Sequence, residues 1–390
     1  MMKMKKWAVL GLALLFSAAL VSAPSPAAAE LKVGVSGYVK LDIQYSDKIA
    51  NDSPGVPSGS PGATPLDPPG GSPASDNSQT IIDARQSRLR ATFSDEVAGV
   101  KMSGRIETDF FTNDFGDFPG LTVSNSARLR LRHAFARADH PSGFSLLAGQ
   151  YWSTFMNSDI AQPDLVDFNG PAGQLFARQP QLRVGYKMPL APGALLFEAA
   201  IEKHFGSTGA ETLGSAVVTE NRGEGQPTPL FAGKVSWLGG PLQAEAAFAV
   251  ADNTIILAAG NDVSKTATGF QVSAQANIPF VANPSPPFVT VFGHYQMIDG
   301  LGRLANGDFP TSFLNAAGTV IENVESTGFY VGARFQINPT TSLNGVWGWH
   351  EADAIPGVFS AATTPLSLET HQSIHLNILH QFWQRWQAGL

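Results

Sequence analysis

The chain alternates apolar and polar residues with a period of two over many separate segments. In residues 33–45, for example, Val33, Val35 and Ile43 fall on one face, whereas Lys40 and Asp42 fall on the other. The same pattern recurs with different residues at 98–111 and 267–279. Because successive side chains of a strand point to opposite faces, each segment predicts a β-strand between an apolar and a polar medium.

Fourteen such segments follow one another along the chain. Each is long enough for a tilted strand to cross a bilayer, which takes about nine to eleven residues. They lie at 33–45, 80–93, 98–111, 127–139, 143–151, 176–188, 193–204, 230–239, 241–251, 267–279, 287–299, 326–338, 340–351 and 369–380. A fifteenth begins at Phe382, and the sequence ends within it.

The connections between these segments alternate between long polar loops and tight turns. The long ones are 46–79, 112–126, 152–175, 205–229, 252–266, 300–325 and 352–368. A soluble β-sandwich would explain alternating strands but not alternating loop lengths. A transmembrane barrel explains both, because its short turns face the periplasm and its long loops face outward. We therefore expect 46–79 to be the first external loop.

Two constraints then set the size of the sheet. In lipid a sheet must close on itself to satisfy its backbone, and single-chain bacterial barrels have even strand numbers. We predict an all-β fold, a transmembrane antiparallel β-barrel of about 16 strands over residues 30–390, with the last strand missing. The alternative is a complete barrel of fourteen strands with a loose tail.

Residues 1–29 have the pattern of a secretory signal peptide. Three lysines precede an apolar core at 7–21, and small residues at 27–29 follow Pro24 and Pro26. The core is too short to span a bilayer comfortably, and a cleavage signal follows it. We expect cleavage after Ala29 and export to the outer membrane, with a short helix of the mature protein as the alternative.

Composition excludes several other classes of protein. No apolar run of about eighteen residues follows the N-terminus, which excludes a helical membrane protein. The chain has no cysteine, and therefore no disulfide or thiolate metal site. A net charge of −7 gives no electrostatic reason to expect nucleic acid as a partner.

Arginine is concentrated in one part of the chain, since ten of the fourteen lie between positions 85 and 183. In 127–139, Leu129, Leu131 and Phe135 share one face by alternation, so the arginines between them share the other. An arginine facing hydrocarbon would cost a few kcal/mol, so these side chains must face the lumen. The same reasoning predicts a basic inner wall of Arg88, Arg90, Lys101, Arg105, Arg128, Arg130, Arg132 and Arg183.

Such a wall has two interpretations. Guanidinium groups bind carboxylates in a fixed geometry, so the wall would form a ladder that guides anions through the lumen. Alternatively the arginines form a structural network that is neutralised by Glu107 and Asp109. The alternation places three further arginines on the apolar face, namely Arg85, Arg137 and Arg178. This position suggests that they lie at strand ends or in a subunit interface.

The loop at 152–175 is rich in aromatic and apolar residues, which favours burial over an ordinary surface loop. Folded inward, it would be the constriction loop of the barrel. Its acids, Asp159, Asp164 and Asp167, would then face the arginines across the narrowest point.

The histidines do not predict a metal site or a catalytic group. His371 and His375 share a strand face but lie about 13 Å apart at strand rise, too far for one ion. The nucleophile motif Gly-x-Ser-x-Gly is absent. We expect no enzymatic activity and no cofactor.

Five motifs together resemble the DcaP-like outer-membrane porins. They are ARQSRL at 84–89, RLRLRHAF at 128–135, LAGQYWSTFM at 147–156, DFNGP at 167–171 and RQPQLR at 178–183. The resemblance implies a trimer of sixteen-stranded barrels that admits small anions, dicarboxylates among them, by diffusion. The chain departs from these porins in lacking the final strand and the N-terminal coiled-coil segment of some relatives.

The sequence therefore predicts an outer-membrane porin for passive diffusion of small anionic solutes through an arginine-lined constriction. Its expected partners are outer-membrane lipid, two further copies of the chain and the solutes themselves. A general, weakly selective porin with structural arginines is the second hypothesis. A non-conducting surface adhesin or structural barrel with a plugged lumen is the third.

Overall fold

A computed structural model describes most of the predicted barrel region. The described residues are 31–46, 79–111, 129–166, 170–204, 226–256, 262–280, 286–305, 311–314, 320–353 and 370–390. The predicted signal peptide at 1–29, Arg128, Asp167 and nearly all of the predicted first external loop lie outside them.

Nearly all regular structure in the described residues is β-strand, together with one short 3-10 helix, η3 (Gly302–Leu304). No helix in this part of the chain is long and apolar enough to cross a membrane. The strands are β1 (Lys32–Tyr38), β2 (Asp42–Ser46), β3 (Gln79–Asp83), β4 (Arg88–Val97), β5 (Val100–Asp109), β6 (Arg130–Asp139), β7 (Phe144–Trp152), β8 (Arg178–Leu190), β9 (Gly193–Glu202), β10 (Leu230–Gly239), β11 (Leu242–Ile256), β12 (Asp262–Pro279), β13 (Phe288–Asp299), β14 (Ser312–Leu314), β15 (Ile321–Asn323), β16 (Glu325–Asn338), β17 (Thr341–Ala352), β18 (Thr370–Trp383) and β19 (Trp386–Gly389).

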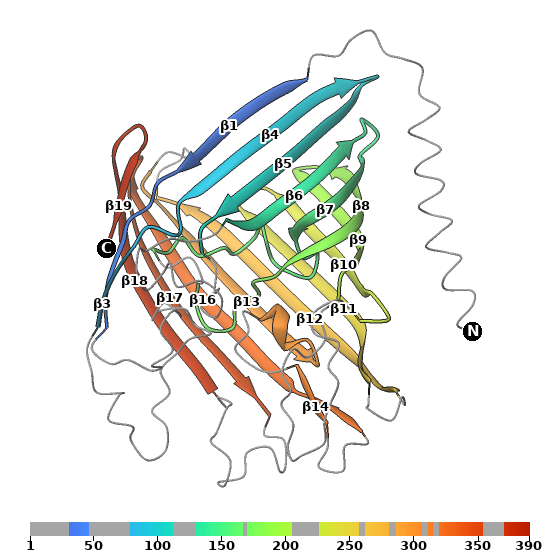
Figure 1. The fold of residues 1–390 in the computed structure, drawn as a ribbon. Coiled ribbons are helices and arrows are strands. Elements are labelled where there is room, and N and C mark those ends of the chain that lie inside the picture. Colours follow the sequence, from blue (N-terminus) through green and yellow to red (C-terminus); the bar gives the residue numbers. More distant parts are fainter. Residues whose placement is uncertain are drawn as a thin grey trace.

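Fifteen of these strands form one sheet in the order β1-β4-β5-β6-β7-β8-β9-β10-β11-β12-β13-β16-β17-β18-β19. Each strand pairs antiparallel with the next, and the sheet curves into a tilted wall (Figure 1). The pair β2–β3 continues the hairpin of β1 and β4 beyond a short break. The architecture is the predicted transmembrane antiparallel barrel.

The strand positions agree closely with the alternation of the sequence. All fourteen predicted segments fall on strands, and β10 has the predicted bounds, 230–239. Several local expectations differ from the structure. The predicted external loop at 252–266 is mostly strand, because β11 continues to Ile256 and β12 begins at Asp262. The predicted segments 33–45 and 80–93 are each divided into two strands. The strand β18 continues to Trp383, so the last strand begins at Trp386 rather than Phe382. The predicted external loop at 300–325 contains a small hairpin of β14 and β15.

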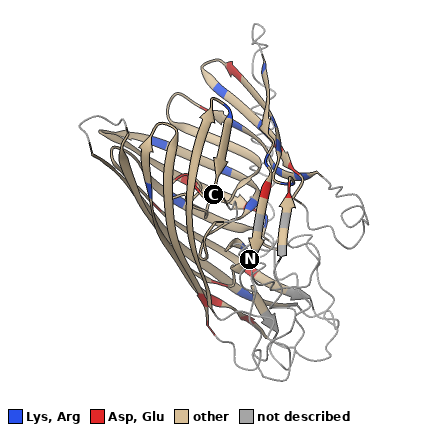
Figure 2. Cartoon of the chain, turned by 90° about the vertical axis from the view of Figure 1, so that its left-hand side faces the viewer, with Lys and Arg blue, Asp and Glu red and all other residues tan. Residues whose placement is uncertain are grey.

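The two faces of the wall differ as the alternation predicts. In β17, Leu343 and Trp347 are exposed, whereas the intervening Asn344, Val346 and His350 are buried. The polar residues therefore lie on the inner face, covered by other parts of the chain, and the exposed face is largely apolar. Charged residues are sparse along the strands (Figure 2).

Candidate functional site

Two carboxylates on β5 organise the predicted arginine wall. Glu107 faces Arg90 of β4, and Asp109 faces Arg88 of β4 and Arg130 of β6. Arg90 Nη2 lies 2.7 Å from Glu107 Oε2. Arg130 donates to both oxygens of Asp109, with its Nη2 2.7 Å from Oδ2 and its Nε 2.8 Å from Oδ1. The carboxylates are buried, whereas the side chains of Arg90 and Arg130 are 33% and 28% exposed.

Arg132 lies between the two carboxylates. Its Nε donates to Glu107 Oε1 at 3.0 Å, and its Nη1 donates to Asp109 Oδ2 at 2.9 Å. The side chain is only 1% exposed. A buried guanidinium needs partners for its donors, and these two acids provide them. We call Arg88, Arg90, Arg130, Arg132, Glu107 and Asp109 the arginine cluster.

A β-bulge at Arg132 changes the phase of β6. Glu107 pairs with His133 and Thr108 with Leu131, so Arg132 is the extra residue. Beyond the bulge, Phe135 pairs with Arg105 on the inner face. The expectation that Phe135 shares the face of Leu131 is therefore wrong, and Arg137 also faces inward, where it pairs with Asp139 of its own strand.

The remaining predicted basic residues lie apart from this cluster. Lys101 is at the far end of β5, between Glu96 and Asp139 of the neighbouring strands. The guanidinium of Arg105 lies over the ring of Phe135, 5.9 Å from its centroid. Arg183 belongs to a second buried network, in which Glu198 binds both Arg183 and Lys234 at 3.2 Å.

Arg178 also lies near the cluster, although the alternation of apolar and polar residues places it on the apolar face of the sheet. Arg178 begins β8, and its guanidinium lies over the rings of Trp152 and Phe176, 5.2 and 5.5 Å from their centroids. Among the residues that the structure describes, neither Arg105 nor Arg178 has a carboxylate oxygen within 4 Å. Within the described residues, the arginine cluster itself has four guanidinium groups and two carboxylates.

The predicted inward loop packs on the inner face of the sheet. We call residues 153–177 the inner loop, of which 153–166 and 170–177 are described. Figure 1 shows the green segment that follows β7 passing within the curve of the wall. At its start, Ser153 Oγ and Thr154 N each donate to the carboxylate of Glu202 at 2.6 Å. The stem is therefore fixed to the end of β9.

Tyr330 of β16 holds the middle of the inner loop. Its hydroxyl donates to the carbonyl of Ala161 at 2.9 Å and accepts from Asn157 Nδ2 at 2.6 Å. The backbone N–H of Ala161 donates to Gln275 Oε1 of β12 at 2.9 Å. Tyr330 is fully buried, so these bonds are made away from solvent.

Further along, the loop meets the wall backbone to backbone. A Cβ on Gly173 would overlap main-chain atoms of Phe329 and Trp349, and one on Gly348 would overlap the carbonyl oxygen of Ala172. Only glycine allows this approach on both sides. The backbone N–H of Ala172 also donates to Ser373 Oγ of β18 at 2.8 Å.

The two loop acids that the structure describes, Asp159 and Asp164, do not pair with the arginine cluster. Asp164 lies 3.6 Å from Arg334 of β16, although it lines one cavity together with Arg88 and Arg132. Asp159 is exposed and accepts a hydrogen bond from Ser158, and Asp167 lies outside the described residues. The acids beside the arginines are Glu107 and Asp109, which strand phase alone could identify.

A polar cavity of about 210 Å³ separates the arginine cluster from the inner loop. Arg88 and Arg132 line one side of it, and Gln162, Asp164, Gln174 and Phe176 are among the loop residues on the other. The described residues contain no group of three or more side chains suited to a metal ion. The arrangement offers cationic hydrogen-bond donors to a small solute and no group placed for covalent chemistry.

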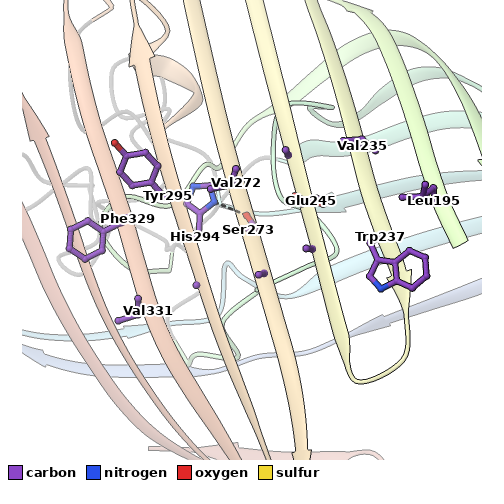
Figure 3. Close-up of a pocket in the computed structure, with 14 residues that line it drawn as sticks. Leu195, Val235, Trp237, Glu245, Val272, Ser273, His294, Tyr295, Phe329 and Val331 are labelled. Carbon is purple, nitrogen blue, oxygen red and sulfur yellow. Dashed lines mark hydrogen bonds between the residues drawn. The ribbon is translucent and has the colours of Figure 1, made fainter. Parts of the chain in front are cut away.

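A second hollow, of about 690 Å³, lies on the opposite, apolar face of the sheet (Figure 3). Val235, Val272 and Val331 line it and are exposed, whereas the alternating Ser236 and Tyr330 are buried on the inner face. The hollow is therefore separated from the arginine cluster by the sheet itself, and it is not part of the candidate passage.

The chain matches the family model described as Gram-negative porin over residues 17–364. A comparison with curated protein sequences gives no significant match.

Several solved structures share the fold. The outer-membrane channel DcaP of Acinetobacter baumannii is 21% identical, with 92% of this chain and 89% of that chain covered and a TM-score of 0.69. OmpF of Salmonella typhi, in complex with daunomycin, is 13% identical, with 93% and 88% covered and a TM-score of 0.54. OmpT of Vibrio cholerae in its trimer form is 11% identical, with 93% and 89% covered and a TM-score of 0.52. The first match confirms the resemblance that the five motifs predict.

Proposed function

The chain belongs to the Gram-negative porin family and is an outer-membrane channel, and from that premise we propose that it admits small anionic solutes, dicarboxylates among them. The solutes diffuse passively along the arginine cluster. The predicted signal peptide at 1–29 directs the chain to this membrane.

One observation carries the proposal. Within the described residues, four guanidinium groups, those of Arg88, Arg90, Arg130 and Arg132, share two carboxylates. Two of the four, Arg88 and Arg132, line the polar cavity on the inner face. Arg90 and Arg130 remain about one-third exposed, so they are available to a passing solute. Fixed positive charge at a narrow passage raises the local concentration of anions.

The inner loop is the constriction of this proposal. It is held at its stem by Glu202 and at its middle by Tyr330, so it stays folded within the lumen. Solutes pass between it and the arginine cluster. We also propose that the chain forms a homotrimer, as the Vibrio cholerae porin does in its trimer form.

A general, weakly selective porin is the second candidate function. The pairing of Glu107 and Asp109 with four arginines favours it, because paired arginines act as scaffold as well as ligands. In that case the exposed donors would add little to the preference for anions.

The test is the reversal potential of the channel in a planar bilayer under a salt gradient at neutral pH. We expect anion selectivity, and an anion-to-cation permeability ratio that falls on the order of twofold in Arg130→Ala. Arg137→Ala is the matched control, because it removes the same charge from the inner face away from the cavity. A dicarboxylate should block the wild-type current more strongly than a monocarboxylate.

Three results would contradict the proposal in different ways. Cation selectivity of the wild-type channel would exclude the arginine cluster as the selective element. Equal effects of Arg130→Ala and Arg137→Ala would support the general porin. A folded chain with no conductance would support a plugged structural barrel.

A further inference from the structure

A second segment folds onto the inner face beside the constriction. Residues 300–305, which include η3, leave the end of β13 and turn inward. Leu301, Leu304 and Ala305 are all buried, with at most 4% of their surface exposed. We call residues 300–305 the latch.

The latch contacts both ends of the inner loop. The backbone N–H of Phe176 donates to the carbonyl of Leu304 at 2.8 Å. Leu301 and Leu304 belong to one buried apolar cluster with Phe155 at the start of the loop and Leu175 near its end. The two ends of the loop are thus packed against one short segment.

The latch is in turn fixed to the rim of the sheet. Asn253 Nδ2 of β11 donates to the carbonyl of Gly300 at 2.9 Å and to Asn323 Oδ1 of β15 at 3.1 Å. The backbone N–H of Gly300 donates to the carbonyl of Val324 at 3.0 Å. Gly300 has a φ of +72°, and a Cβ there would overlap both asparagine side chains.

His204, just beyond β9, completes this anchor. Asn253 uses its amide group as a donor, so its Oδ1 accepts from His204 Nε2 at 2.8 Å. Burial lowers the pKa of His204, so the ring is neutral at pH 7 and donates through Nε2–H. The latch is therefore held by β11, β15 and the end of β9 together.

From these contacts we infer that the latch positions the constriction. The latch and the stem of the inner loop fill the lumen against the alanine-rich inner faces of β10, β11 and β12, where Ala232, Ala247 and Ala249 join the apolar cluster. Among the described residues, this packing leaves the cavity beside Arg88 and Arg132 as the passage, so we expect solutes to pass along the arginine cluster. The inference rests on the proposed function of the inner loop.

Loss of packing at the latch should change the channel in a specific way. Leu304→Ala leaves a cavity beside Phe155 and Leu175, which frees the stem to move. We expect single-channel conductance to rise on the order of twofold and anion selectivity to fall. Leu304→Met, which nearly conserves volume, should restore both toward the wild-type values.

Two comparisons separate positioning from a general loss of stability. Leu343→Ala removes a leucine from the exposed face of β17 and should leave conductance and selectivity unchanged. Each measurement is made on single inserted channels, so a smaller folded fraction does not alter the value. Should Leu304→Ala not insert, Leu304→Val tests the same contact with a smaller loss.

The outcomes distinguish this inference from the proposed function. An anion-selective wild-type channel whose conductance and selectivity are unchanged in Leu304→Ala, or in Leu304→Val, overturns the latch alone. A wild-type channel without anion selectivity overturns the proposed function instead. Higher conductance in Leu304→Ala with wild-type behaviour in Leu304→Met establishes the latch.

Discussion

At the scale of single residues, the arginines of the cluster have different roles. Arg132 is buried between Glu107 and Asp109, and removing either acid would leave an underpaired charge away from water. Arg90 and Arg130 share the same acids but keep part of their surface in the lumen. Arg132 joins β6 to β5 through the two acids, and Arg90 and Arg130 present donors to a solute.

Replacement of Glu107 by glutamine should separate these two roles. Glu107→Gln removes one negative charge, so we expect stronger anion selectivity in the reversal potential. It also removes a buried partner of Arg132 and Arg90, so the free energy of unfolding should fall by about 3 kcal/mol. Urea unfolding in detergent micelles measures the second effect.

The control for this variant is Asp139→Asn. Asp139 pairs with Arg137 on the same strand, and its side chain is 42% exposed. Such an exposed pair contributes less than about 1 kcal/mol. Equal stability losses in the two variants would show that burial of Glu107 has no energetic role.

At the scale of elements, strand positions were predictable because two media impose strict alternation on every strand. The exception was β6, where Arg132 adds one residue opposite β5 and reverses the phase. No glycine or proline marks this bulge in the sequence, so counting from Leu131 placed Phe135 and Arg137 on the wrong face. Alternation along a strand therefore assigns side chains to a face correctly only as far as the next β-bulge.

The inner loop shows a second limit of sequence reasoning. Its apolar composition predicted burial, but its contacts depend on residues more than a hundred positions away, such as Tyr330, Gly348 and Ser373. Nothing local marks Tyr330 as the residue that holds Ala161. The latch was likewise expected to be part of an external loop.

The contact of Tyr330 with the inner loop leads to a prediction. Tyr330→Phe removes the hydroxyl and leaves the carbonyl of Ala161 and the amide of Asn157 without this partner in a buried site. We expect a loss of about 1–3 kcal/mol of stability and larger fluctuations of the open-channel current. Tyr295→Phe, on the exposed face of β13, should show neither effect in thermal unfolding and current recordings.

At the scale of the whole molecule, the lumen is asymmetric. The inner loop and the latch lie against β10 to β12 and β16 to β18, whereas the cavity opens toward β4 to β6. Under the proposed function, a solute that crosses beside the inner loop experiences the field of the arginine cluster. Such a field is long-range only where mobile ions do not screen it.

Salt concentration should consequently tune the selectivity of the channel. The Debye length falls from about 10 Å at 0.1 M salt to about 3 Å at 1 M. We expect the anion-to-cation permeability ratio to approach unity over this range of KCl, and to change less in Arg130→Ala. A ratio independent of salt would indicate selection by size instead of charge.

The glycine contact between the inner loop and the wall has an evolutionary consequence. Gly173 and Gly348 bring the inner loop and the wall together largely through main-chain atoms. The backbone therefore fixes the position of the inner loop, and with it the width of the passage between this loop and the arginine cluster. The chemistry of the passage depends on other residues, those whose side chains line it. Mutations that change which solutes the channel admits can therefore accumulate among the lining side chains without altering the width of the passage.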